Sequence, residues 1–280
     1  MIRNFDELLQ AARQTSGGEA SRTVLVVGPV NAETADAIRQ AREGLRLQFV
    51  FAELNAGMEV LARGEAGILM KGGVDTATLI KMALKPESGL RTGRLLSDVF
   101  VFEYAARPEN RLVMITDGGL NIAPDLEAKV QLIRNAVAVA HALGNANPKV
   151  AVLSASEFVQ ANMPSSVEAA ALAQMNARGQ IQGCVVDGPL ALDNALQAQA
   201  AGEKSIRGAV AGAAEILLCP TIECANMLAK STTYIGNARL AHVIVGARIP
   251  ILIPSRADKS DAKLLSLALG MMMAASPAGM

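Results

Sequence analysis

The side chains with the clearest chemical potential follow an apolar run near the end of the chain. Residues 249–253 predict a buried strand bounded by prolines, and apolar residues recur at helical spacing over 264–271. Between these elements lie a hydroxyl, a guanidinium and two carboxylates: Ser255, Arg256, Asp258 and Asp261. Ligands of open α/β sheets bind beyond the carboxyl ends of strands, so this corner is a candidate site. In the plainer alternative, Asp258 or Ser260 caps the helix and Arg256 is a solvated charge.

Other predicted strands end in similar turns. Their sequences are Lys71-Gly72-Gly73, Asp117-Gly118-Gly119, Ser154-Ala155-Ser156-Glu157 and Asp187-Gly188-Pro189. Glycines let backbone amides approach an anion, and helix N-termini favour negative charge, although the same residues also serve turn shape alone. Together the turns predict a phosphate-bearing ligand, but neither the Walker motif nor the dinucleotide glycine motif is present.

Strands and helices alternate along the chain. The predicted strands cover 23–28, 47–51, 67–73, 99–102, 111–116, 149–154, 183–187, 215–219, 242–245 and 249–253. The predicted helices cover 5–15, 31–43, 58–64, 76–84, 126–143, 166–175, 224–229, a stretch around Leu240, and 264–271. Asn31 is the expected cap of the second of these helices. This alternation implies crossover connections and mostly parallel sheets.

Size and composition limit the function classes. A chain of 280 residues favours two domains over one large α/β unit, with candidate junctions at 86–94 or 144–148. The core must be mainly aliphatic, because 51% of residues are hydrophobic but only 3% aromatic. Lysine plus arginine balance aspartate plus glutamate at 26 each, which argues against a nucleic-acid partner.

Cysteine usage and hydropathy predict a cytoplasmic protein with no membrane partner. The three cysteines, Cys184, Cys219 and Cys224, are too few for a disulfide framework and suit a reducing compartment. With only two histidines, no zinc-ligand spacing is found, and no metal is expected. The N-terminal residues lack the pattern of a secretory leader, and no apolar run approaches membrane-spanning length.

Six stretches together resemble the phosphate acetyl/butyryltransferase family. They cover 69–81, 89–98, 115–121, 185–193, 226–230 and 253–258, in the order of the family and over most of the chain. The resemblance is greater to the phosphate butyryltransferase branch, which the modest length of the chain also fits. It implies two α/β domains with mostly parallel sheets and an interdomain cleft, as in isocitrate and isopropylmalate dehydrogenases. We expect residues 1–130 and 260–280 in the first domain and 131–259 in the second.

The resemblance also implies an activity. A short acyl group, butyryl in preference to acetyl, would move reversibly between coenzyme A and inorganic phosphate by direct thiolate attack in a ternary complex. Coenzyme A is then a co-substrate, acyl-CoA and acyl phosphate are the acylated partners, and no tightly bound cofactor is expected. A homodimer or larger homo-oligomer is implied as well.

The family's catalytic Ser-Arg pair matches Ser255 and Arg256 directly. The family's aspartate falls near Ala262, so Asp261 is the first choice for the base and Asp258 the second. A carboxylate helps to ionise a thiol, a hydroxyl stabilises an oxyanion, and arginine holds phosphate bidentately. The substrate and phosphate ligands implied by the matching stretches are Lys71, Gly72, Thr76, Lys81, Asp117, Gly118, Asn121, Asp187, Asn226 and Lys230.

Two other functions remain open from the sequence. A non-catalytic CoA-sensing or acyl-CoA-sensing module would bind the same ligands without turnover. A metal-dependent decarboxylating dehydrogenase would need clustered metal-binding aspartates and nicotinamide contacts, which the sequence does not offer.

Overall fold

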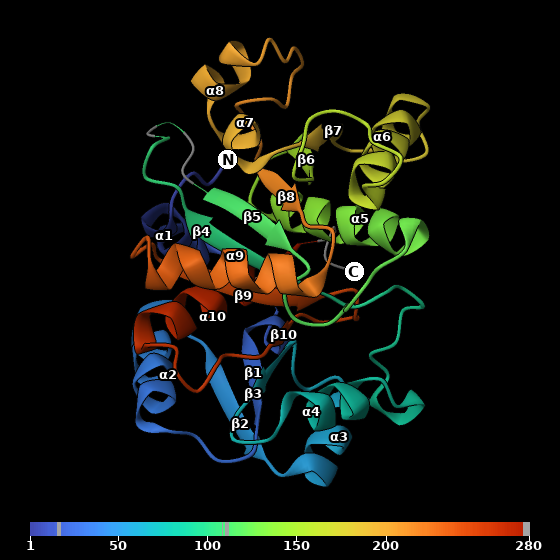
Figure 1. Ribbon diagram of the computed structural model, residues 1–280. Helices are drawn as coiled ribbons and strands as arrows, with labels where there is room; N and C mark the ends of the chain where they lie inside the picture. Colours follow the sequence, from blue (N-terminus) through green and yellow to red (C-terminus); the bar gives the residue numbers. More distant parts are fainter. Residues whose placement is uncertain (16–17, 108, 110–111, 277–280) are drawn as a thin grey trace. The chain divides into compact units, whose positions relative to one another are not determined.

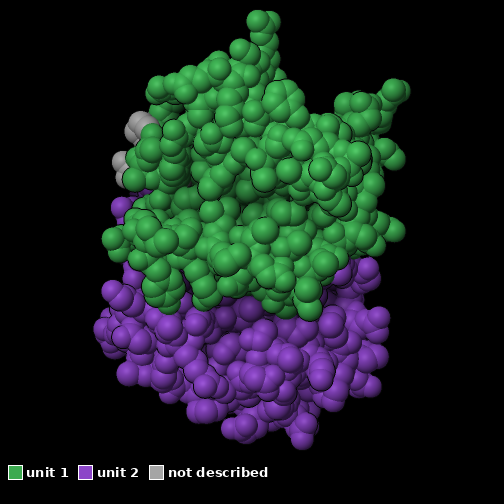
Figure 2. Space-filling view, in the orientation of Figure 1, with its two compact units in different colours: residues 1, 97–238 green, residues 2–96, 239–280 purple. Residues whose placement is uncertain are grey.

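The chain divides into two compact units in the computed structural model, which describes residues 1–15, 18–107, 109 and 112–276 (Figures 1 and 2). The terminal unit comprises 2–96 and 239–280, and the central unit comprises residue 1 and 97–238. The first boundary between the units, between residues 96 and 97, lies just after the candidate junction at 86–94. The expected domain ranges differ from these units, because 97–130 groups with the central segment and 239–259 with the terminal one.

The terminal unit contains a sheet of β2-β1-β3-β10-β9, in that order. Its strands are β1 (Thr23–Val27), β2 (Gln48–Ala52), β3 (Ile68–Lys71), β9 (Leu240–Val245) and β10 (Ile251–Leu252). β1 is parallel to β2 and β3, and β3 is parallel to β10, whereas β9 runs antiparallel to β10. Every residue of β1 and β3 is buried, which explains the apolar runs 24–27 and 68–70 within them. The carboxyl ends of β1, β3 and β10 therefore meet at one edge.

Helices cover both faces of this sheet. They are α1 (Phe5–Gln14), η1 (Ala20–Arg22), α2 (Ala32–Leu45), α3 (Leu54–Ala62), α4 (Thr76–Ala83), η2 (Pro86–Ser88) and α10 (Ser260–Ala275). α1, α2 and α10 pack together on one side, and α3 and α4 on the other (Figure 1). The side chain of Asn31 accepts a hydrogen bond from the Thr34 amide and begins α2, which confirms the predicted cap.

The strands of the central unit follow the order β4-β5-β8-β6-β7. The strands are β4 (Ser97–Glu103), β5 (Leu112–Thr116), β6 (Lys149–Leu153), β7 (Val185–Leu190) and β8 (Ile216–Leu218). β4 is antiparallel to β5, and the other pairs are parallel. The helices are α5 (Leu126–Ala142), α6 (Pro164–Ala177), α7 (Leu192–Leu196), α8 (Ala198–Glu203) and α9 (Ile222–Tyr234). α5 and α6 pack on one face, and α9 packs on β4 and β5 from the other.

The predicted α/β class with mostly parallel sheets is confirmed. The helix expected around Leu240 is wrong, because Leu240 begins β9. The sequence also missed α7 and α8, whose five and six residues are too few to display a helical period. Residue 111 of one predicted strand lies outside the described residues. Over the described ranges, no helix has both the length and the apolar character required to cross a bilayer.

Candidate active site

The turn between β10 and α10 folds around Ser255. The Ser255 amide donates to Asp258 Oδ2 at 2.7 Å, and the Asp258 amide donates back to the Ser255 carbonyl at 3.2 Å. Ser255 Oγ accepts from the Ala257 amide at 3.4 Å, while its own hydrogen makes no hydrogen bond within the described part of the chain. The Asp258 carboxylate thus closes the turn and does not cap α10, whose N-cap residue is Lys259 and makes no side-chain cap.

Two side chains from helices support this turn. Lys263, in the second turn of α10, is 1% exposed and donates from Nζ to the Asp258 carbonyl. Glu33 of α2 accepts from the Ser260 amide at 2.7 Å. Burial lowers the pKa of Lys263, and the negative charges of Asp258 and Glu33 oppose that shift in part. A buried cation therefore lies directly beneath the loop that carries Ser255 and Arg256.

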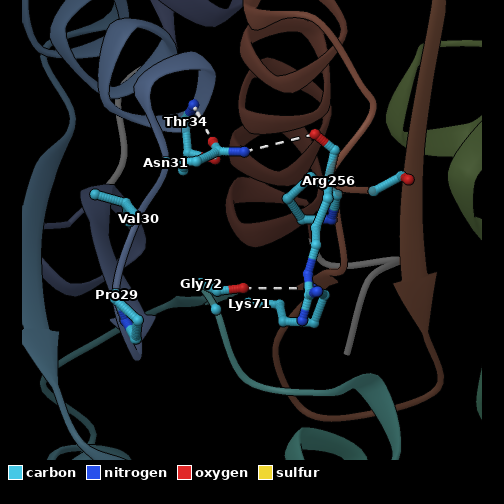
Figure 3. Close-up of a pocket in the computed structure, with 10 residues that line it drawn as sticks. Pro29, Val30, Asn31, Thr34, Lys71, Gly72 and Arg256 are labelled. Atoms are coloured by element: carbon cyan, nitrogen blue, oxygen red, sulfur yellow. Dashed lines mark hydrogen bonds between the residues drawn. The ribbon is translucent and has the colours of Figure 1, made fainter.

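A cavity of about 250 Å³ opens beside the turn, within the terminal unit (Figure 3). Its walls come from the carboxyl ends of β1, β3 and β10: Pro29, Val30, Asn31, Thr34, Lys71, Gly72, Gly73, Pro254, Ser255 and Arg256. The Arg256 side chain extends toward Lys71 across it (Figure 3). The predicted residues Ser255, Arg256, Lys71 and Gly72 thus share one cavity, although 71 and 255 are far apart in sequence.

Lys71 gives this cavity an unusual electrostatic character. It is 7% exposed, and among the described residues its Nζ donates to the carbonyls of Gly72 and Val74, at 3.3 and 3.4 Å. Burial lowers the pKa of Lys71, and the positive charges of Arg256 and Lys263 lower it further, while the charges of Asp258 and Asp75 oppose the shift in part. Two cations that face one cavity, with no carboxylate hydrogen-bonded to either in the described part of the chain, favour an anion between them.

Gly72 and Gly73 allow two loops to approach closely. The Gly72 amide donates to the Val27 carbonyl at 2.9 Å, so it is already used within the sheet. A Cβ on Gly72 would lie 2.6 to 2.8 Å from three backbone oxygens of residues 27–29, and one on Gly73 would lie 2.7 Å from Pro29 Cγ. These glycines therefore bring the loop after β1 against Lys71, and the Gly72 amide is not free to bind an anion.

Four predicted residues of the terminal unit do not line the cavity: Asp258, which holds the Ser255 turn, and Asp261, Thr76 and Lys81. Asp261 forms an ion pair with Arg239 at 3.4 Å, and Arg239 also contacts Asp6 at 2.9 Å. Thr76 is half-buried at the start of α4, and Lys81 is exposed in its last turn. The structure therefore leaves Asp261, the first choice for the base, on a different face of the α10 N-terminus from the Ser255 turn.

In the central unit, Asp117 organises the turn after β5. It is 3% exposed, and Oδ1 accepts from the amides of Asp98, Gly119 and Leu120 at 3.1, 2.9 and 3.2 Å. Oδ2 accepts from the amide and side-chain nitrogens of Asn121. Burial raises the pKa of Asp117, and the charge of Asp98 adds to this, while the amide hydrogen bonds oppose it. Both carboxylate oxygens therefore accept hydrogen bonds that hold the turn, which is typical of a structural group.

The remaining predicted residues lie around this turn or apart from it. Asn226 of α9 donates to the Gly118 carbonyl at 2.8 Å, and Lys230 is exposed one turn further along the helix. Asp187 lies on β7, and its Oδ1 accepts from the Gly188 amide at 2.8 Å. In the sheet, β8 and β6 separate β7 from β5, so Asp187 does not join the Asp117 turn.

Neither a metal site nor a buried thiol nucleophile is built from the described residues. Among them, no group of three His, Cys, Asp or Glu side chains could hold a metal ion. Burial raises the pKa of Cys184 to about 11 and that of Cys219 to about 12, which keeps both thiols protonated. Cys224 is exposed at the start of α9.

The loop after β1 was not predicted from the sequence as part of the site. Pro29, Val30, Asn31 and Thr34 line the cavity, but only Asn31 was singled out, as a helix cap. The available signal was their position beyond a buried strand, the same rule that selected Ser255. Lys263 carried no signal at all, because an isolated lysine in a helix is ordinarily solvated.

The chain is similar in sequence and in fold to known proteins of one family. The family model described as "Phosphate acetyl/butaryl transferase" matches residues 8–271. The "Probable phosphate butyryltransferase" of Bacillus subtilis (strain 168) is 45% identical over 270 residues, covering 94% of this chain and 89% of that protein. The phosphate butyryltransferase of Clostridium beijerinckii is 39% identical and covers 98% and 99% of the two chains. The crystal structure of a branched-chain phosphotransacylase from Enterococcus faecalis V583 has a TM-score of 0.80 and 32% identity, and covers 90% of this chain and 98% of that one. The chain therefore belongs to the phosphate acetyl/butyryl transferase family.

Proposed function

We propose that the chain transfers a short acyl group reversibly between coenzyme A and inorganic phosphate, with butyryl favoured and acetyl possible. Family membership and the names of the relatives support this reaction. The observation that carries it is the cavity in which Lys71 and Arg256 face one another beside Ser255. Two cations next to a hydroxyl can hold phosphate and stabilise the charge that develops on an acyl carbonyl.

The reaction needs no covalent enzyme intermediate. Phosphate held by Arg256 and Lys71 attacks the thioester carbonyl, the new C–O bond forms, and the C–S bond breaks. Coenzyme A leaves as a thiolate and takes a proton; in reverse, the thiolate attacks the acyl phosphate. The hydrogen of the Ser255 hydroxyl, which is unused within the described residues, points to a donor for the oxyanion. Positioning and electrostatics then supply the rate enhancement.

Asp258 is the better supported base, ahead of Asp261. Asp258 is bonded to the Ser255 amide, and its Oδ1 accepts no hydrogen bond among the described residues. Asp261 instead faces Arg239. A carboxylate beside the reacting atoms can accept the thiol proton, whereas one held in an ion pair elsewhere cannot reach it.

The test is phosphorolysis of acyl-CoA by the purified protein, followed as release of free thiol. We expect turnover with acyl chains of two to six carbons, and an Arg256→Ala variant with kcat/KM for phosphate lower by about 10²–10³-fold. Arg178, an exposed arginine of the central unit, provides the matched control, since Arg178→Ala should leave that constant unchanged. Binding of coenzyme A without any turnover would refute the enzyme assignment and favour a CoA-sensing module.

The same assay separates the two aspartates. Asp258→Asn should lower turnover by at least tenfold, whereas Asp261→Asn should retain it; the opposite result would return the role to Asp261. The homo-oligomeric assembly, the cytoplasmic location and the lack of a tightly bound cofactor stay predictions from the sequence.

A further inference from the structure

One wall of the cavity beside Ser255 is apolar. It consists of Pro29 and Val30 from the loop after β1 and Pro254 from the end of β10. Val30 is 36% exposed, although it is an aliphatic residue, and it lies across the cavity from Lys71 and Arg256 (Figure 3). A ligand that covered this side chain would remove apolar surface from water, which is favourable.

The polar neighbours of this wall are already paired. Asn31 Oδ1 accepts from both the amide and the hydroxyl of Thr34, at 2.9 and 2.7 Å. Asn31 Nδ2 donates to the Arg256 carbonyl at 3.5 Å. The loop after β1 therefore presents carbon atoms to the cavity, and its amide side chain serves to hold the loop against Arg256.

We propose that Val30, with Pro29 and Pro254, forms the seat for the alkyl chain of the transferred acyl group. This inference rests on the proposed function. In an acyl phosphate, one bridging oxygen separates the phosphorus from the carbonyl carbon. A phosphate held by Lys71 and Arg256 therefore places the first methylenes of the chain inside the same 250 Å³ cavity. Of the walls around that cavity, this one offers the apolar surface that such methylenes require.

Val30 is the member of the seat that sets chain length. Pro29 is held by the close approach of Gly73, and its ring leaves it little freedom to move. Pro254 is buried at the end of β10. Pro29 and Val30 are both exposed, but only the side chain of Val30 lies outside a ring, so a change in its size alters the space beyond the second carbon of the acyl group.

The first experiment measures kcat/KM for acetyl-, butyryl- and hexanoyl-CoA at saturating phosphate. Val30→Phe should lower the butyryl-to-acetyl ratio by about tenfold or more, and Val30→Ala should raise the hexanoyl-to-butyryl ratio. The KM for phosphate should stay unchanged in both variants. Val50→Phe is the matched control, because Val50 of β2 is 37% exposed in the same unit and lies outside the cavity. Equal chain-length ratios in all four proteins would overturn the proposal.

A binding measurement separates the seat from the reaction. Calorimetric titration with methylphosphonate and butylphosphonate requires neither coenzyme A nor turnover. We expect the unmodified chain and Val50→Phe to bind butylphosphonate more tightly than methylphosphonate, and Val30→Phe to lose that preference. If no acyl-CoA is turned over, the proposed function is refuted, and the affinities for the two phosphonates still test the seat. If acyl-CoA is turned over but no protein binds butylphosphonate more tightly than methylphosphonate, only the seat is refuted.

Discussion

Replacing Lys263 by methionine should separate stability from activity. Lys263 is 1% exposed and supports the Ser255 turn through one hydrogen bond to the Asp258 carbonyl. Loss of that bond costs about 1.5–3 kcal/mol, because the donor is charged. Burial of an ammonium group, however, costs several kcal/mol, and methionine fills a similar volume without that penalty. We therefore expect the free energy of unfolding at pH 7 to be unchanged or higher by up to about 2 kcal/mol.

Activity should move in the opposite direction. Without Lys263, the Asp258 carbonyl has no hydrogen-bond donor among the described residues, and the loop that presents Ser255 and Arg256 is less constrained. A displacement of about 1 Å at such a site can cost about 10²-fold. We expect kcat/KM for phosphate to fall by about 10–100-fold, or about 1.4–2.7 kcal/mol of transition-state stabilisation.

The assay combines urea unfolding with phosphorolysis kinetics, and Lys259→Met is the control because Lys259 is exposed next to the same turn.

The sign of the pH dependence of stability adds a second check. The pKa of Lys263 is lowered in the fold, whereas an unfolded lysine titrates near pH 10.4. Between these values the unfolded chain binds more protons, so the stability of the unmodified protein rises with pH. Any stability advantage of Lys263→Met should accordingly shrink from pH 7 to pH 10. Unchanged kinetics, or a loss of more than about 2 kcal/mol of stability, would refute this reasoning.

Two further predictions concern the loop after β3. Because burial and neighbouring cations lower the pKa of Lys71, kcat/KM for phosphate should decline on the alkaline side below pH 10.5, and Lys71→Arg should shift that decline to higher pH. An identical pH profile in the variant would exclude Lys71 as a phosphate ligand. Gly72→Ala should lower the free energy of unfolding by about 2–3 kcal/mol, because its Cβ would meet backbone oxygens at 2.6 to 2.8 Å. Gly18→Ala, whose Cβ would meet nothing within 4 Å, should be tolerated; equal stability of both variants would contradict the close approach.

Local patterns were sufficient for the elements and for the centre of the site. Short continuous apolar runs predicted β1, β3 and β10, and apolar residues at helical spacing predicted most helices, because both patterns extend over only a few residues. The helix cap at Asn31 and the polar corner at Ser255 and Arg256 were equally readable, since cap chemistry and strand-end turns are encoded by neighbouring residues. The boundaries of the two units could not be predicted in this way, because the grouping of 97–130 and 239–259 depends on contacts between distant segments.

Tertiary structure alone decided which side chains share the cavity. The order β1-β3-β10 brings Val30, Lys71 and Arg256 to one edge of the sheet, and no spacing in the chain encodes that order. It also directs Asp258 to the Ser255 turn and Asp261 to Arg239, although both aspartates lie close together in sequence. The physical reason is that periodicity and caps are local, whereas burial, ion pairing and close backbone approach depend on which strands become neighbours.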